Sequence, residues 1–180
     1  AHIAQVLVAI LFFILTACGK NEALTPPITE IPGIAFGTNN TLDVVTWNLK
    51  EFPYSPNTIN YLKELIPQMN VDVIAFQEIM DQASFYALAN QLPNYSAYVY
   101  NATSSYRLAY LYDIRTVTVN AQYTIFNNDS NPFPRPPYVL EITHGNKDYV
   151  LINNHFKALG DNFIDESNSY DEEVRRRLAS

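Results

Sequence analysis

Polar side chains end three apolar stretches of this sequence, and their types could do chemistry together. Asn48 closes "LDVVTWN", Glu78 closes "VDVIAFQE", and His155 closes "DYVLINNH". The carboxylate of Glu78 can bind a divalent cation, and the amide of Asn48 can hold a ligand or a water molecule. His155 titrates near neutral pH and can move a proton or stabilise negative charge. A metal ion, a histidine and an amide suit attack on phosphorus, because the metal neutralises developing negative charge.

Each of these residues alone has an ordinary explanation, because a strand that emerges at a protein surface ends in solvated side chains. The recurrence of the pattern is what carries information. The C-terminal ends of strands in an α/β sheet converge on one crevice, where ligands bind. We therefore expect Asn48, Glu78 and His155 to lie close together.

The hydrophobic pattern predicts the elements that must position these side chains. β-branched and aromatic residues indicate strands over 42–50 and 71–79, and an apolar stripe after Ser55 indicates a helix over 55–69. The other expected elements are a helix over 81–92, strands over 95–100, 106–114 and 116–125, a hairpin over 136–156 that turns at 144–147, and a helix beginning near Asp171. This order implies a mixed sheet with helices packed outside, an α/β layered sandwich.

Composition limits the kinds of metal and partner. The chain has 180 residues and a net charge of -7, which argues against a protein that grips nucleic acid through phosphate contacts alone. An enzyme that cleaves nucleic acid through a metal ion is compatible with this charge. The single cysteine, Cys18, excludes an intrachain disulfide and a cysteine zinc cluster, and the three histidines lack ligand spacing. Any metal should therefore be a hard cation held by carboxylate and amide oxygens.

The first residues have the features of a secretion signal. The apolar run from Ile3 to Leu15 is shorter than the roughly 20 residues that cross a bilayer, and small residues follow it. "LTACG" resembles the lipobox of bacterial lipoproteins, which implies cleavage before Cys18 and lipidation of its thiol. We expect a signal peptide over 1–17, a lipidated Cys18 with a flexible tether over 18–41, and a domain over 42–180. The alternative is a buried apolar helix with an incidental cysteine.

Three segments together carry a more specific resemblance. "TWNLKEF", "DVIAFQEI" and "VLINNHFKALGD" resemble, in order and spacing, the successive motifs of the endonuclease/exonuclease/phosphatase superfamily. The resemblance runs from about Asp43 to the end of the sequence. It implies the DNase I-like fold, a four-layer α/β/β/α sandwich with mixed sheets and outer helices. Cleavage of a phosphodiester with Mg²⁺ or Mn²⁺ as cofactor is the activity that it implies.

The resemblance also implies roles for individual residues. Glu78 would be the metal ligand, His155 would contact the scissile phosphate as a catalytic histidine, and Asn48 would orient phosphate or a metal-bound water. The implied phosphate-binding positions are Asn48, Arg135, Asn153 and Lys157. Arg135 lies in "FPRPPYVLEI", and an arginine flanked by prolines is also common as a plain loop residue.

Two motifs that the superfamily leads one to expect are missing from the 180 residues. Neither an Asp-x-Asn after a further apolar strand nor a Ser-Asp-His is present, and "GDNF" at 160–163 has no preceding strand. The motifs would supply a second histidine and its aspartate partner, which activate the attacking water. Their absence is expected if the sequence is a fragment of a longer gene product, which alone would be inactive. A short relative without activity is the alternative.

The hypothesis that follows is a Mg²⁺-dependent phosphodiesterase, an endonuclease anchored at the bacterial cell envelope through lipidated Cys18. The membrane face stays open, and nothing in the sequence points to a protein partner. The substrate stays open between DNA, RNA, a phospholipid and a sugar phosphate, because no aromatic and basic groove is evident. A second hypothesis is a non-catalytic surface lipoprotein that uses the same fold as a binding module.

Overall fold

A computed structural model describes residues 30–101, 106–156 and 160–180. The predicted signal peptide, Cys18 and Lys157 lie outside these ranges. Within them, no helix is long and apolar enough to cross a membrane.

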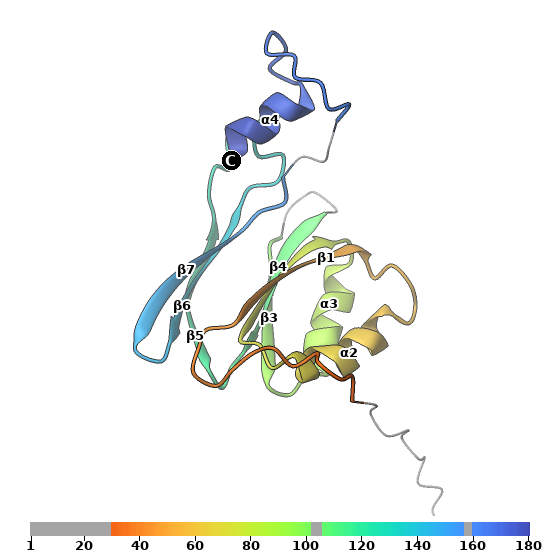
Figure 1. Cartoon of the computed structure of the whole chain (residues 1–180), viewed down its shortest axis with the longest axis vertical. Helices are drawn as coiled ribbons and strands as arrows, with labels where there is room; N and C mark the ends of the chain where they lie inside the picture. The colour runs from red at the N-terminus through yellow and green to blue at the C-terminus, as the bar shows by residue number, and fades with distance from the viewer. Residues whose placement is uncertain (1–29, 102–105, 157–159) are drawn as a thin grey trace, which may run out of the picture.

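Two β-sheets form the centre of the molecule (Figure 1). The first sheet has the strand order β1-β2-β4-β3, and the second has the order β5-β6-β7. The strands are β1 (Val44–Phe52), β2 (Val73–Ile79), β3 (Tyr95–Val99), β4 (Arg107–Asp113), β5 (Val117–Thr124), β6 (Tyr138–His144) and β7 (Lys147–Asn153). Parallel pairing of β1 with β2 makes the first sheet mixed, whereas the second sheet is antiparallel throughout. The predicted strands and the hairpin turn between β6 and β7 are confirmed.

Two helices cover the outer face of the first sheet. Helix α2 (Thr58–Met69) connects β1 to β2, because parallel neighbours need a crossover, and α3 (Gln82–Ala89) connects β2 to β3. Leu62, Ile66 and Met69 are the buried stripe of α2. The side chain of Asp81 caps α3 by accepting a hydrogen bond from the main-chain nitrogen of Ala83 at 2.9 Å.

The core has two parts, one on each face of the first sheet. One apolar cluster joins this sheet to α2 and α3, and the other joins it to the second sheet. Tyr110 illustrates the contact between the sheets, because its hydroxyl donates to the main-chain oxygens of Tyr138 at 2.9 Å and Leu151 at 3.1 Å. Burial raises the pKa of Tyr110, so the phenol stays protonated and keeps both bonds. The two sheets are thereby held face to face.

The described residues form three layers, helices, sheet and sheet, of the predicted four-layer sandwich. Helix α4 (Glu172–Ala179) lies beyond the strand ends and not on the outer face of the second sheet (Figure 1). Arg175 fixes it there by donating to the main-chain oxygens of Ser130 and Asn131. Val150 and Ile152, on that outer face, are 60% and 52% exposed.

The last part of the predicted tether packs on the domain. The main-chain nitrogens of Phe36 and Gly37 donate to the oxygen of Met69 at the end of α2, at 3.3 and 3.2 Å. Ile34 packs against the core under α2. Contact with the domain therefore begins before residue 42.

Gly37→Ala should destabilise the protein by about 2 kcal/mol. A Cβ at this position would lie 1.5 Å from the main-chain oxygen of Asn70, so the backbone would have to move. Urea unfolding of the full-length protein measures the loss. In the matched control Gly33→Ala, the added Cβ meets no atom within 4 Å, and a smaller loss of about 1 kcal/mol is expected from its positive φ. Equal unfolding midpoints for Gly37→Ala and wild type would contradict the packing of this segment.

Candidate active site at the strand ends

The pairing of β1 with β2 becomes irregular where the predicted site residues lie. Asn48 pairs with Gln77 in regular parallel register, and pairing resumes only at Phe52 opposite Ile79. Our prediction that the strand ends at Asn48 is corrected, because β1 continues through this irregularity. A bulge of this kind bends a strand and redirects its side chains.

Three non-glycine residues within the irregularity have left-handed backbone conformations. The φ angles of Lys50, Glu51 and Glu78 are 46°, 59° and 64°. Such conformations cost of order 1–3 kcal/mol each and persist only where the surroundings enforce them. Their clustering is typical of a functional site, where the required direction of the side chains outweighs the energetic cost of a strained backbone.

Hydrogen bonds from β1 fix the carboxylate of Glu78. Its Oε1 accepts from Nδ2 of Asn48 at 2.9 Å, and its Oε2 accepts from the main-chain nitrogen of Glu51 at 3.1 Å. Asn48 is oriented in turn, because its Oδ1 accepts from the main-chain nitrogen of Lys50 at 2.8 Å. Two of the predicted site residues are therefore brought together directly.

His155 completes the cluster from the second sheet. The prediction that the strand reaches His155 is corrected, because β7 ends at Asn153. The Nε2 atom of His155 lies 3.5 Å from Oε1 of Glu78, and the side chain is 18% exposed. Its Nδ1 is buried and has no hydrogen-bond partner among the described residues. Burial and the charge of Arg135 lower the pKa of His155, against the opposing effect of Glu78, and this favours the neutral ring.

Arg135 reaches the site through the backbone next to His155. Its Nε and Nη2 donate to the main-chain oxygen of His155 at 3.2 and 3.1 Å, and Nη2 also donates to that of Phe156 at 3.2 Å. Burial lowers the pKa of this guanidinium, while the nearby charges of Glu78 and Tyr106 oppose the shift. Arg135 thus holds the backbone of His155 and Phe156 in place and lies close enough to Glu78 for their charges to interact.

Asn153, one of the predicted phosphate-binding positions, lies in the interior of the protein. Its side chain is buried between the sheets, and Nδ2 donates to the main-chain oxygens of Phe76 at 2.9 Å and Ala109 at 3.1 Å. Its Oδ1 accepts from Nε2 of Gln77 at 2.7 Å. Because both donors and the oxygen are engaged, this amide joins β7 to the first sheet.

Three residues near Glu78 were missed by sequence reasoning. Glu51 and Lys50 follow Asn48 in the irregular part of β1, and the hydroxyl of Tyr106 donates to Oε1 of Glu51 at 3.0 Å. That hydrogen bond and the charges of Glu51 and Glu78 raise the pKa of Tyr106. Tyr106 precedes β4, which runs antiparallel to β2, so its start lies beside the end of β2. Only the antiparallel pairing could have revealed this neighbour.

The donor set fits Mg²⁺ better than a cation that needs a cage of protein ligands. Glu78 offers a partly exposed carboxylate held in place by Asn48, and carboxylate and amide oxygens suit a hard cation. Mg²⁺ commonly binds one or two carboxylates and keeps several waters for substrate phosphate to replace. The described part of the chain has no group of three or more His, Cys, Asp or Glu residues that could hold a metal ion.

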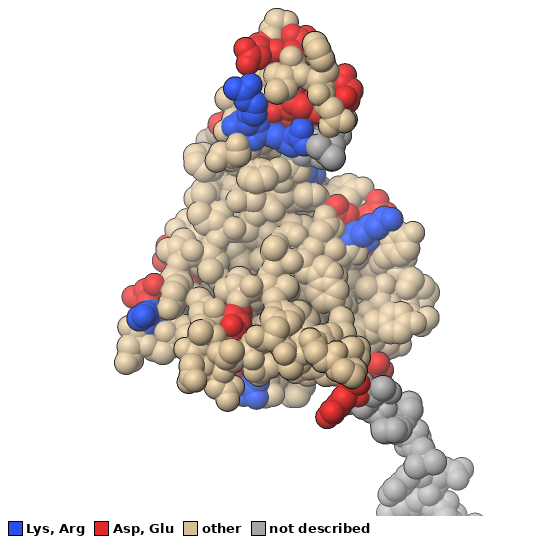
Figure 2. Space-filling view, viewed as in Figure 1, with Lys and Arg blue, Asp and Glu red and all other residues tan. Residues whose placement is uncertain are grey.

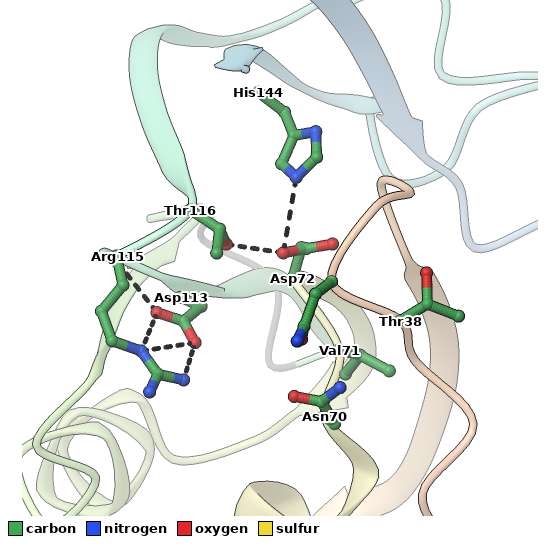
Figure 3. A pocket seen from close by; sticks show the side chains of 9 residues that line it. Thr38, Asn70, Val71, Asp72, Asp113, Arg115, Thr116 and His144 are labelled. Atoms are coloured by element: carbon green, nitrogen blue, oxygen red, sulfur yellow. Dashed lines mark hydrogen bonds and ion pairs between the residues drawn. The ribbon is translucent and has the colours of Figure 1, made fainter.

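A hollow of about 270 Å³ lies at the opposite end of the first sheet (Figure 3). Asp72 before β2 and Asp113 at the end of β4 are buried in its wall. Asp72 accepts from the hydroxyl of Thr116 at 2.6 Å and lies 3.8 Å from Nε2 of His144, while Asp113 binds the guanidinium of Arg115. Because these carboxylates are already paired, we assign this hollow no chemistry.

Comparison with known proteins gives structural neighbours only. No family model matches the sequence, and no curated protein matches it. D. rerio TDP2 complexed with single strand DNA product has a TM-score of 0.58 and 15% identity, covering 76% of this chain and 53% of that one. Truncated Caenorhabditis elegans TDP2 has a TM-score of 0.52 and 23% identity, covering 66% of this chain and 47% of that one.

The chain has the DNase I-like fold. This confirms the predicted fold class, although identities this low show the fold alone. The chain spans about half the length of these two structures.

Asn153→Ala should destabilise the protein by about 3 kcal/mol. The change removes three hydrogen bonds and leaves two main-chain oxygens and the amide of Gln77 buried with fewer partners. Asn120→Ala is the matched control, because Asn120 is exposed and donates only to Thr143, and its loss should stay within about 0.5 kcal/mol. Urea unfolding compares the two. Equal losses would contradict the bridging role of Asn153.

Proposed function

We propose that this protein is a Mg²⁺-dependent phosphodiester hydrolase that cuts nucleic acid as an endonuclease at the bacterial cell envelope. The observation that carries the proposal is the cluster of Asn48, Glu78 and His155 at adjoining strand ends, with a carboxylate that accepts two hydrogen bonds and a histidine 3.5 Å from it. A fixed oxygen ligand beside a histidine is the arrangement expected for chemistry at phosphorus.

Each residue of the cluster has a distinct part in this proposal. Mg²⁺ bound at Glu78 would supply positive charge that neutralises the phosphate as negative charge develops. Asn48 keeps the carboxylate in position through its amide donor. Burial and Arg135 lower the pKa of His155 and favour the neutral imidazole, which can donate a hydrogen bond from Nε2 to a phosphate oxygen. Arg135 holds the main-chain oxygens of His155 and Phe156, which fixes where the ring stands.

A nucleic acid substrate is supported by the fold comparison and is compatible with the charge. One structural neighbour, D. rerio TDP2, was solved with a single strand DNA product. A net charge of -7 argues against binding that relies on phosphate contacts over a broad surface. Local contacts and a bound metal must therefore provide affinity for the substrate.

The cell-envelope location rests on the sequence around Cys18. "LTACG" and the apolar run before it support lipidation and membrane anchoring. A phospholipid would be within reach of an anchored enzyme, so a lipid phosphodiester is the competing substrate that the assay must include.

Glu78→Gln should abolish nicking of plasmid DNA by the complete gene product, produced without its predicted signal and lipidation site. The amide keeps the shape of the side chain but loses the charge that binds Mg²⁺. We expect wild-type nicking that needs Mg²⁺ and stops with chelator, and a loss of about 100-fold or more in the variant. Gel electrophoresis of supercoiled plasmid measures both.

Glu64→Gln is the control, because Glu64 is an exposed carboxylate on α2. Its nicking rate should equal that of wild type. Intact plasmid in every lane would reject the nuclease proposal, and phospholipid and sugar-phosphate esters would then be assayed with the same variants. If those esters are not hydrolysed either, the result would favour a non-catalytic protein that uses the fold for binding.

Arg135→Lys should lower kcat about 10-fold and leave KM nearly unchanged. A lysine cannot reproduce the planar fork that binds two carbonyl oxygens, so His155 would be misplaced for the reaction. Steady-state kinetics on a short oligonucleotide provide both constants. A raised KM with unchanged kcat would instead assign Arg135 to the phosphate contact that the sequence predicts.

A further inference from the structure

An exposed tyrosine stands at the edge of the candidate active site. Tyr54, just past the end of β1, is 65% exposed, and the ammonium of Lys50 lies 5.2 Å from the centre of its ring. Figure 2 shows a small patch of opposite charges beside large uncharged side chains where β1 ends. Single exposed aromatic residues are ordinary in proteins, so the position of Tyr54 must be what distinguishes it.

Short links connect this ring to Glu78. Lys50 reaches the ring of Tyr54 with its ammonium, and its main-chain nitrogen donates to Asn48, which donates to Glu78. The next residue, Glu51, donates its main-chain nitrogen to Glu78 directly. The left-handed backbone of Lys50 and Glu51 sets the direction in which the chain runs from Asn48 to Tyr54. Tyr54 is therefore held by the same backbone that orients the carboxylate.

We propose that Tyr54 and Lys50 form a stacking platform for a base of single-stranded nucleic acid, next to the phosphate that reacts at Glu78. This inference rests on the proposed function. Every base has a flat π-face that stacks on an aromatic ring without regard to sequence. The ammonium covers one face of the ring, and the exposure of Tyr54 leaves the other face for a base. A phosphocholine or sugar-phosphate group has no flat aromatic surface that could stack on the ring of Tyr54.

Charge near the platform indicates that stacking carries the affinity. The carboxylates of Glu51 and Glu78 offset Lys50 and Arg135, and the whole chain has a net charge of -7. Binding through phosphate contacts would weaken steeply with salt, whereas stacking releases few counterions. Binding should therefore depend on the ring of Tyr54 and only weakly on salt.

The test is fluorescence anisotropy with the full-length protein, Mg²⁺ and a labelled phosphorothioate dT oligomer that resists cleavage. Tyr54→Ala should raise Kd about 10-fold, in keeping with the loss of one stacked base. Tyr54→Phe keeps the ring and should restore wild-type Kd. Tyr123→Ala is the matched control, because Tyr123 is 42% exposed on β5 of the other sheet.

A duplex of the same length should bind more weakly than the single strand, because paired bases cannot stack on a side chain. Equal Kd values for wild type and Tyr54→Ala, or binding of duplex as tight as of single strand, would overturn the platform. Hydrolysis of bis(p-nitrophenyl) phosphate by wild type tests the proposed function separately, because it measures cleavage of a diester and not the binding of nucleic acid. Hydrolysis together with an unchanged Tyr54→Ala Kd would reject the platform and retain the hydrolase. A raised Tyr54→Ala Kd without hydrolysis would reject the hydrolase and retain Tyr54 as a site that binds bases.

Discussion

The hydrogen bond between Gln77 and Asn153 is the constraint on which the candidate site depends. It joins the two sheets at 2.7 Å, with both side chains buried. Gln77 directly precedes Glu78, and Asn153 stands two residues before His155. Because a buried amide must satisfy its donors and acceptor, this pair has essentially one arrangement. That arrangement places a carboxylate from one sheet beside an imidazole from the other.

Backbone geometry then decides where the carboxylate points. A regular strand would alternate side chains strictly between the two faces of the sheet. The irregular pairing after Asn48 and the left-handed φ of Glu78 break this alternation, and Glu78 turns toward β1. The hydrogen bonds from Asn48 and Glu51 offset part of the backbone cost. The residues with strained backbone conformations, Glu51 and Glu78 among them, are thus also residues of the proposed site.

The polar groups of the site form one connected system with little net charge. Arg135 holds the backbone at His155 and interacts with the charge of Glu78. Burial and Arg135 lower the pKa of the imidazole, and the hydroxyl of Tyr106 donates to Glu51. A bound divalent cation would make this system attractive to an anion without a basic surface elsewhere. This would reconcile the proposed chemistry on phosphodiesters with an acidic protein, and it leaves the exposed ring of Tyr54 as the feature proposed to discriminate between substrates.

The sequence by itself determined the strands, the helices and the turn after His144, because periodicity is a local signal. It also predicted that Asn48, Glu78 and His155 lie close together, which contacts between the two sheets bring about. Tertiary structure alone decided that Asn153 bridges the sheets, that Arg135 binds carbonyl oxygens, and that Tyr106 borders the site. Those outcomes depend on the register between sheets and on a bulge. Both are set by packing between segments far apart in the chain, which no local pattern encodes.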